Sequence, residues 1–464
     1  MFSAAGFLSS SMLSILSNPQ RFWAQTQQPL RAFRNFLKTS GIDVELDQAL
    51  SWKNNRQLAI QLAILARVQQ AQQKNGDARR DGTVAANTTP ISSEFWTRAR
   101  RYMRYATAVY GRHMIRAVQV DARGQRFNAL AKSVGQETLQ AISEHVQVPT
   151  DDLILVHVDQ DYEGEDQDQG HHHHTLRHLV AIDHAHKEVV LALRGTFSLQ
   201  EVVIDIASFS RENYCGGEAH EGMANMAERV WEVAGGTVVS LLEQHPNYTF
   251  IVTGHSLGGG TASLLTILLK QQQLQQTRPF TERTVGTEDN YPPRLPPSTE
   301  LQCFAYASPP VFTPLEVIPQ ARQLITNFIH DTDAVPFLSV YSVRQLLAQL
   351  KALQPHVKNL TWGEKLSIAT GSQPPATALV DTVAVVTPKR GAPRLEVPAA
   401  QTIWLRPSSK KEDQDHHDYR ASVWKRLPST ISIHSNMLLD HFPPRYEYAL
   451  DHVVVVEEQE NETK

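Results

Sequence analysis

Cysteine is scarce in this sequence, since only Cys215 and Cys303 occur among 464 residues. Two cysteines can build neither a disulfide framework nor a cysteine-rich zinc module. The chain also lacks an uninterrupted apolar run of about 18 residues, so no ordinary transmembrane helix is expected. An excess of one charge is missing too, because 44 Lys and Arg stand against 48 Asp and Glu. This near-neutral balance argues against a dedicated nucleic-acid binder, which is usually basic.

The chain nevertheless holds enough apolar matter for a full core, since 41% of its residues are hydrophobic and only 20% are charged. This composition excludes disorder of the whole chain. A length of 464 residues corresponds to about two to four ordinary domains, or to one large domain with insertions.

The first 42 residues contain no acidic side chain, because the first one in the chain is Asp43. They combine a weak apolar run over residues 1–16 with four basic residues, Arg21, Arg31, Arg34 and Lys38. A secretory signal places its positive charge before its apolar run, and none stands there. A transit peptide or a membrane-surface helix therefore fits better, with a docking helix or a frayed tail as the alternative.

Shifts in composition divide the chain into three parts. Residues 1–90 are expected to form an N-terminal extension, in which 54–74 predicts a helix and 75–90 a polar linker. Residues 455–464 are expected to form an acidic tail, and residues 91–454 one α/β domain, because the sequence motifs that carry the chemistry are spread across that span.

Three polar segments interrupt the predicted domain, near residues 159–174, 270–299 and 351–429. Loops this long inside a compact domain are usually functional or disordered. The first segment ends in His171–His174, which indicates a solvated loop, with metal binding as the alternative. The third contains two strand-like pieces, Leu379–Thr387 and Leu395–Leu405.

Strongly apolar segments rich in β-branched residues lie between these insertions. They predict buried strands at residues 178–182, 188–193, 249–253, 302–306 and 323–329. Two further segments, Gly222–Leu242 and Gly259–Leu269, have the pattern of helices. Strands that alternate with helices indicate an α/β fold.

The most informative motif is a G-x-S-x-G formed by residues 254–258. An apolar strand precedes it and a helix start rich in small residues follows, as a nucleophile elbow requires. The turn is so tight that Gly254 and Gly258 must lack side chains. It would hold the Ser256 hydroxyl at the carboxyl edge of the sheet, over a helix N-terminus that favours developing negative charge. The alternative is a glycine-rich crossover with an incidental serine.

A serine hydroxyl needs a positioned base, and in this fold the chain order is Ser, acid, His. The predicted strand 323–329 ends near two carboxylates, Asp331 and Asp333, either of which could orient an imidazole. Candidate bases further downstream are His356, His416, His417, His434, His441 and His452. Position alone favours none of them, although His441 lies near the chain end and is followed by rigid prolines.

Several blocks occur in the order typical of one family. They are Trp96–Gly111, Ala192–Thr196 with its RGT, His220–Met223, Gly254–Gly259 with its GHSLGG, Phe304–Pro310, Asp333–Pro336 with its D-x-V-P, and Asp440–Tyr446. Through these blocks the sequence resembles the class 3, fungal-lipase-like lipases, especially their diacylglycerol lipase branch. The resemblance covers roughly residues 91–454, with the insertions unmatched.

This resemblance implies an α/β-hydrolase fold with a central, mostly parallel sheet, helices on both faces and long inserted loops. It implies a triad of Ser256, Asp333 and His441, and an oxyanion hole built from the backbone N–H groups of Thr196 and Leu257. It calls for no metal and no cofactor.

The implied function is hydrolysis of acyl esters of glycerolipids, of the sn-1 diacylglycerol or triacylglycerol lipase type. A phospholipase A1 or general carboxylesterase of the same fold is one alternative, and a non-catalytic lipid-binding scaffold is another. The expected partner is a lipid ester at a membrane or lipid-droplet surface, inside the cell or an organelle, with no nucleic acid. Lids are predicted at residues 197–213 and 270–299. Two positions depart from the family pattern and bear on substrate contacts. Glu201 stands where an aspartate is usual, and Phe337 stands where an arginine often follows D-x-V-P.

Overall fold

The computed structural model describes residues 55–80, 91–111, 114–115, 136–157, 176–195, 210–276, 293–384, 394–408 and 418–454. The predictions for residues 1–42, for the insertion near 159–174 and for the acidic tail lie outside these ranges. None of the helices within them combines the length and the apolar content that a membrane crossing needs.

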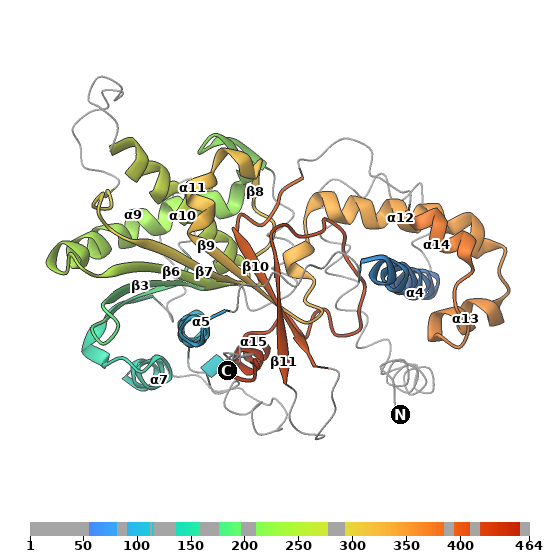
Figure 1. Ribbon diagram of the computed structural model, residues 1–464, viewed down its shortest axis with the longest axis horizontal. Coiled ribbons are helices and arrows are strands. Elements are labelled where there is room, and N and C mark those ends of the chain that lie inside the picture. The colour runs from blue at the N-terminus through green and yellow to red at the C-terminus, as the bar shows by residue number, and fades with distance from the viewer. Residues whose placement is uncertain are drawn as a thin grey trace, which may run out of the picture.

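An eight-stranded sheet runs through the middle of the molecule (Figure 1). Its strands, in spatial order, are β1 (Leu153–His157), β2 (His178–Asp183), β3 (Glu188–Leu193), β6 (Thr249–His255), β7 (Leu301–Tyr306), β9 (Ile325–His330), β10 (Gln401–Pro407) and β11 (Tyr419–Trp424). The strands from β3 to β10 run parallel to one another, whereas β1, β2 and β11 pair antiparallel with their neighbours. The carboxyl ends of the parallel strands therefore share one edge.

The central strands are buried on both faces, which explains why they read as continuous apolar runs. Every residue of β2 and β3 is buried, and so is every residue of β6 after Thr249. The five strands that the sequence predicted are confirmed, as is the α/β fold.

Two layers of helices cover the sheet (Figure 1). On one face lie α9 (Glu221–Gln244) and α10 (Leu257–Gln276), whose core includes Trp231 and Phe250. The opposite face carries α5 (Ser93–Ala108), α7 (Gln136–Val146) and α15 (Pro443–Asp451), packed around a second core. The helices predicted on both faces are thus present.

Several further elements are short. They are the small sheet of β4 (Ser210–Tyr214), β5 (Gly217–His220) and β8 (Phe312–Thr313), the helix α11 (Pro319–Gln323), and the 3-10 turns η1 (Thr150–Asp152), η3 (Leu315–Val317) and η4 (Val335–Phe337).

A third core lies beside the sheet, where the early helix α4 (Asn55–Arg80) meets three late helices (Figure 1). These are α12 (Val340–Lys358), α13 (Trp362–Thr370) and α14 (Thr377–Ala384). Their shared core joins Ile64 and Leu65 to Leu350 and Ile368. Helix α4 also continues to Arg80, into the segment predicted as linker.

The strand-like reading of Leu379–Thr387 is wrong as far as residue 384, because this stretch belongs to helix α14. Its apolar residues Leu379, Val380 and Val383 recur at helical spacing and are buried in the third core. The Thr382 hydroxyl donates to the carbonyl oxygen of Ala378, one turn earlier. Packing of one apolar helix face against α4 and α12 therefore outweighs the β-propensity of the valines and threonines.

Candidate active site

Ser256 lies in the sharp turn between β6 and α10 and is completely buried. Its φ of +60° is in the left-handed region, which costs a non-glycine residue about 1–3 kcal/mol and clusters at functional sites. Its N–H donates to the carbonyl oxygen of Tyr306 at 2.8 Å, which fastens the turn to β7. The strand–turn–helix arrangement predicted from the G-x-S-x-G motif is therefore present.

The two glycines of the motif are required by close backbone contacts. A Cβ on Gly254 would lie 2.5 Å from the carbonyl carbon of Gly258 and 2.9 Å from the carbonyl oxygen of Leu193. A Cβ on Gly258 would lie 2.8 Å from the carbonyl carbon of Arg194. Backbone cannot swing away as a flexible side chain can, so both positions exclude any larger residue.

The structure brings Ser256, His441 and Asp333 together, although 185 and 108 residues of chain separate His441 from the other two. Nε2 of His441 lies 2.8 Å from Oγ of Ser256, and Nδ1 lies 3.0 Å from Oδ2 of Asp333. A carboxylate can only accept, so Nδ1 carries the hydrogen. Nε2 is then free to accept the hydrogen of the serine hydroxyl, which is the arrangement that a general base needs.

Asp333 lies in the turn after β9 and is 1% exposed. Besides His441, its carboxylate accepts the backbone N–H of Val335 at 2.9 Å and the hydroxyl of Tyr446 at 2.6 Å. Burial and the Asp333 charge raise the pKa of Tyr446 well above its usual value, so this hydroxyl stays a donor. The sequence motif contained Tyr446, but only the fold reveals its contact with the acid.

A second set of contacts ties the loop that carries the acid to the loop that carries the base. The Asp440 carboxylate accepts both the backbone N–H and the hydroxyl of Thr332. His330 Nδ1 donates to the carbonyl oxygen of Asp440 at 3.0 Å. Burial lowers the pKa of His330, which keeps its ring neutral and lets Nε2 accept from the Tyr419 hydroxyl. These hydrogen bonds fix Asp440 and thereby restrain the position of the adjacent His441.

The ring of His255 packs against the ring of His441, with 4.8 Å between the two ring centroids. Burial lowers the pKa of His255 well below its usual value, and the nearby His441 adds to this shift. The Tyr110 hydroxyl lies 3.2 Å from Nδ1 of His255. A neutral His255 adds no positive charge beside the base.

Of the two predicted oxyanion-hole residues, the structure describes Leu257 but not Thr196. Leu257 is the first residue of α10, so its N–H has no acceptor inside the helix. Thr196 lies outside the described residues. The strand that leads to it nevertheless passes against the elbow, because a Cβ on Gly195 would lie 2.5 Å from the carbonyl oxygen of His255 and 3.1 Å from Cβ of Ser256.

The competing acid and bases lie elsewhere. Asp333, rather than Asp331, contacts His441. His356 is exposed on α12, and Nδ1 of His452 donates to the carbonyl oxygen of Tyr448. His434 is partly buried on the same segment as His441, whereas His416 and His417 lie outside the described residues.

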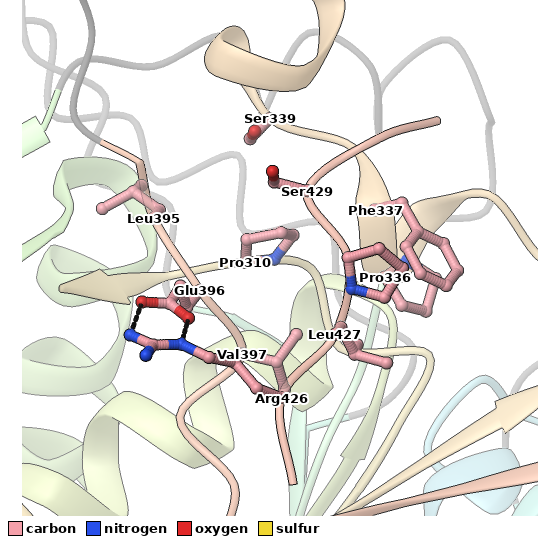
Figure 2. A pocket seen from close by; sticks show the side chains of 11 residues that line it. Pro310, Pro336, Phe337, Ser339, Leu395, Glu396, Val397, Arg426, Leu427 and Ser429 are labelled. Carbon is pink, nitrogen blue, oxygen red and sulfur yellow. Dashed lines mark hydrogen bonds and ion pairs between the residues drawn. The ribbon is translucent and has the colours of Figure 1, made fainter. Parts of the chain in front are cut away.

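Figure 2 shows a pocket lined by residues that follow β7 and β9. Pro310 lies near its centre, and the rings of Pro336 and Phe337 lie on one side. Arg426 lies on another side and pairs with Glu396, with Nη2 2.6 Å from Oε1. Phe337 therefore adds an apolar ring to this lining where the family resemblance leads one to expect a charged arginine. Ser256, His441 and Asp333 are not among the residues that line this pocket.

The mostly parallel sheet, the helices on both faces and the elbow define an α/β-hydrolase fold. Within this fold, residues 190–342 match the family model described as Lipase (class 3).

Similar proteins include the diacylglycerol lipase-beta of Mus musculus, 28% identical over 37% of this chain and 23% of its own length. The secreted mono- and diacylglycerol lipase A of Penicillium cyclopium is 30% identical over 35% of this chain and 47% of its own. A solved Rhizomucor miehei lipase–propeptide complex is 15% identical over 78% of this chain and 80% of its own, with a TM-score of 0.39. The chain thus spans less than half the length of these two curated relatives.

Proposed function

We propose that this protein is a serine-dependent lipase that hydrolyses acyl ester bonds of glycerolipids. The observation that carries the proposal is the hydrogen-bonded series of Ser256, His441 and Asp333, with the serine in a strained elbow at a helix N-terminus. The match of residues 190–342 to the class 3 lipases supports the same chemistry.

In the proposed reaction, Oγ of Ser256 attacks the ester carbonyl while Nε2 of His441 takes its proton. Asp333 fixes the imidazole tautomer and stabilises the imidazolium. The backbone N–H groups of Leu257 and Thr196 would stabilise the oxyanion. His441 then gives the proton to the leaving alcohol, and water attacks the acyl-enzyme by the reverse of these steps.

For the substrate we propose diacylglycerol or triacylglycerol, cleaved at the sn-1 position. The support is similarity to relatives that are themselves named diacylglycerol lipases or mono- and diacylglycerol lipases. We further propose that the basic, acid-free residues 1–42 bring the protein to a membrane or lipid-droplet surface, since such a segment favours anionic lipid.

The test is lipid-substrate profiling of the purified protein beside its Ser256→Ala variant. Diacylglycerol and phosphatidylcholine are offered separately in mixed micelles, together with a water-soluble short-chain ester. The proposal expects diacylglycerol turnover that Ser256→Ala abolishes while its melting temperature is kept. Preferential release of fatty acid from phosphatidylcholine would point to a phospholipase A1. Turnover of the short ester alone would contradict the lipase reading, and no turnover at all would leave a lipid-binding scaffold.

A further inference from the structure

A buried amide on the N-terminal helix α4 reaches the segment that carries His441. Gln69 is 7% exposed. Its Nε2 donates to the carbonyl oxygen of Ile431 at 3.0 Å and to Oε1 of Gln349 at 3.2 Å. Its Oε1 accepts the backbone N–H of Ile433 at 3.0 Å. The amide group therefore bonds one C=O and one N–H on either side of residue 432, as the backbone of a neighbouring strand would.

The segment that Gln69 holds has no regular secondary structure of its own. Between the end of β11 at Trp424 and the start of α15 at Pro443, the chain forms only turns and irregular backbone. Backbone N–H and C=O groups in such a segment need partners from elsewhere when they are buried. Gln69 supplies partners for two of them, shortly before the chain reaches His441.

Helix α4 is itself fixed against the late helices, so Gln69 stands on a rigid support. Ile64, Leu65 and Val68 are fully buried in the third core. Arg67 Nη2 donates to the carbonyl oxygen of Thr370 at 3.0 Å, and Gln72 Nε2 donates to that of Val380 at 2.7 Å.

We propose that Gln69 is a positioning residue for His441: it braces the 431–433 backbone and so sets where the imidazole stands relative to Ser256. This inference rests on the proposed function for its kinetic consequence. Gln69 touches neither Ser256 nor His441, so it acts only through the segment that it holds. Helix α4, which lies outside the family match, would then help to position the catalytic base.

The discriminating experiment compares Gln69→Leu with Gln72→Leu in the full chain. Both changes keep the side-chain volume close and delete hydrogen bonds from α4 to a distant backbone. Only Gln69→Leu releases the 431–433 segment. We expect its kcat on a soluble ester to fall at least about tenfold with KM nearly unchanged, because a misplaced base slows the chemical step rather than binding. Gln72→Leu should lower the melting temperature while kcat stays at the wild-type value.

Backbone hydrogen exchange over residues 425–441 gives a readout that does not depend on turnover. Exchange should become faster in Gln69→Leu and stay unchanged in Gln72→Leu. Equal losses of kcat in both variants, or unchanged exchange in Gln69→Leu, would overturn the proposal that Gln69 positions His441. If wild type hydrolyses no ester while Gln69→Leu still accelerates exchange, the proposed function fails and the structural half of the inference stands.

Discussion

Tyr446 donates its hydroxyl hydrogen to Oδ2 of Asp333 across 2.6 Å, inside a fully buried site. Tyr446→Phe keeps the ring and removes this hydrogen bond, so Asp333 loses one of the donors that orient its carboxylate. We expect kcat/KM to fall by about tenfold, equivalent to about 1.4 kcal/mol. Ester turnover measures this. Tyr448→Phe on the same helix is the control and should leave kcat/KM within about twofold of wild type.

His441→Ala should lower kcat to the level of Ser256→Ala, because the members of such a triad act as a unit. The His441 ring contacts both Ser256 and Asp333, so its removal ends both interactions. His434→Ala, on the same segment, should keep turnover near wild type. The reverse pattern in a turnover assay would refute the choice of base.

Asp331→Asn should raise stability at pH 8 and leave it unchanged near pH 3. Burial, with a smaller contribution from the Asp440 charge, raises the pKa of Asp331 to about 6. An unfolded aspartate has a pKa of about 3.9. Between these two pKa values the folded state keeps a proton that the unfolded state loses. The free energy of unfolding therefore falls as the pH rises from about 4 to about 6, and the loss is complete above pH 6. Asparagine carries no such charge and tolerates the positive φ at this position.

Denaturant unfolding across pH checks this, with a gain of at most about 3 kcal/mol at pH 8. Asp333→Asn serves as the comparison for activity, because it should lower kcat by about 10⁴ while Asp331→Asn stays active. A variant of Asp331 that loses turnover like Asp333→Asn would show that the acid had been misassigned.

Gly258→Ala should lower the free energy of unfolding by about 3 kcal/mol, since its Cβ would meet backbone atoms of Leu193 and Arg194. Gly236 is the matched position, because it is exposed in the interior of α9 and a Cβ there has open space. Gly236→Ala should raise stability by about 0.5–1 kcal/mol. Urea unfolding of both variants tests the steric argument, and similar effects would contradict it.

Deletion of residues 1–50 should lower binding to anionic vesicles and leave turnover of a soluble ester unchanged. The deleted stretch contains the basic, acid-free segment, whereas Gln69 and the buried face of α4 remain. Vesicle co-sedimentation measures the first effect. Loss of soluble expression instead would favour a docking helix.

Local patterns were enough to predict five buried strands of the central sheet, the elbow and Ser256, because each depends on residues adjacent in sequence. The same patterns failed at Leu379–Thr387, where packing against α4 and α12 decides for a helix. Asp331 and Asp333 could not be separated on position alone, since both follow β9 and only the side chain that faces His441 can orient it. The resemblance to class 3 lipases chose Asp333, and the structure places that residue against the histidine. Contacts such as Gln69 with Ile431 join residues 362 positions apart and leave no local signal.

The packing of α4 against α12, α13 and α14 has a consequence for synthesis on the ribosome. The helix ends at Arg80, but its partner α14 ends only at Ala384. At about 5–20 residues per second, the apolar face of α4 waits roughly 15–60 s for its partners to be translated. During that interval the nascent chain offers an uncovered hydrophobic surface, which is the kind of segment that chaperones bind.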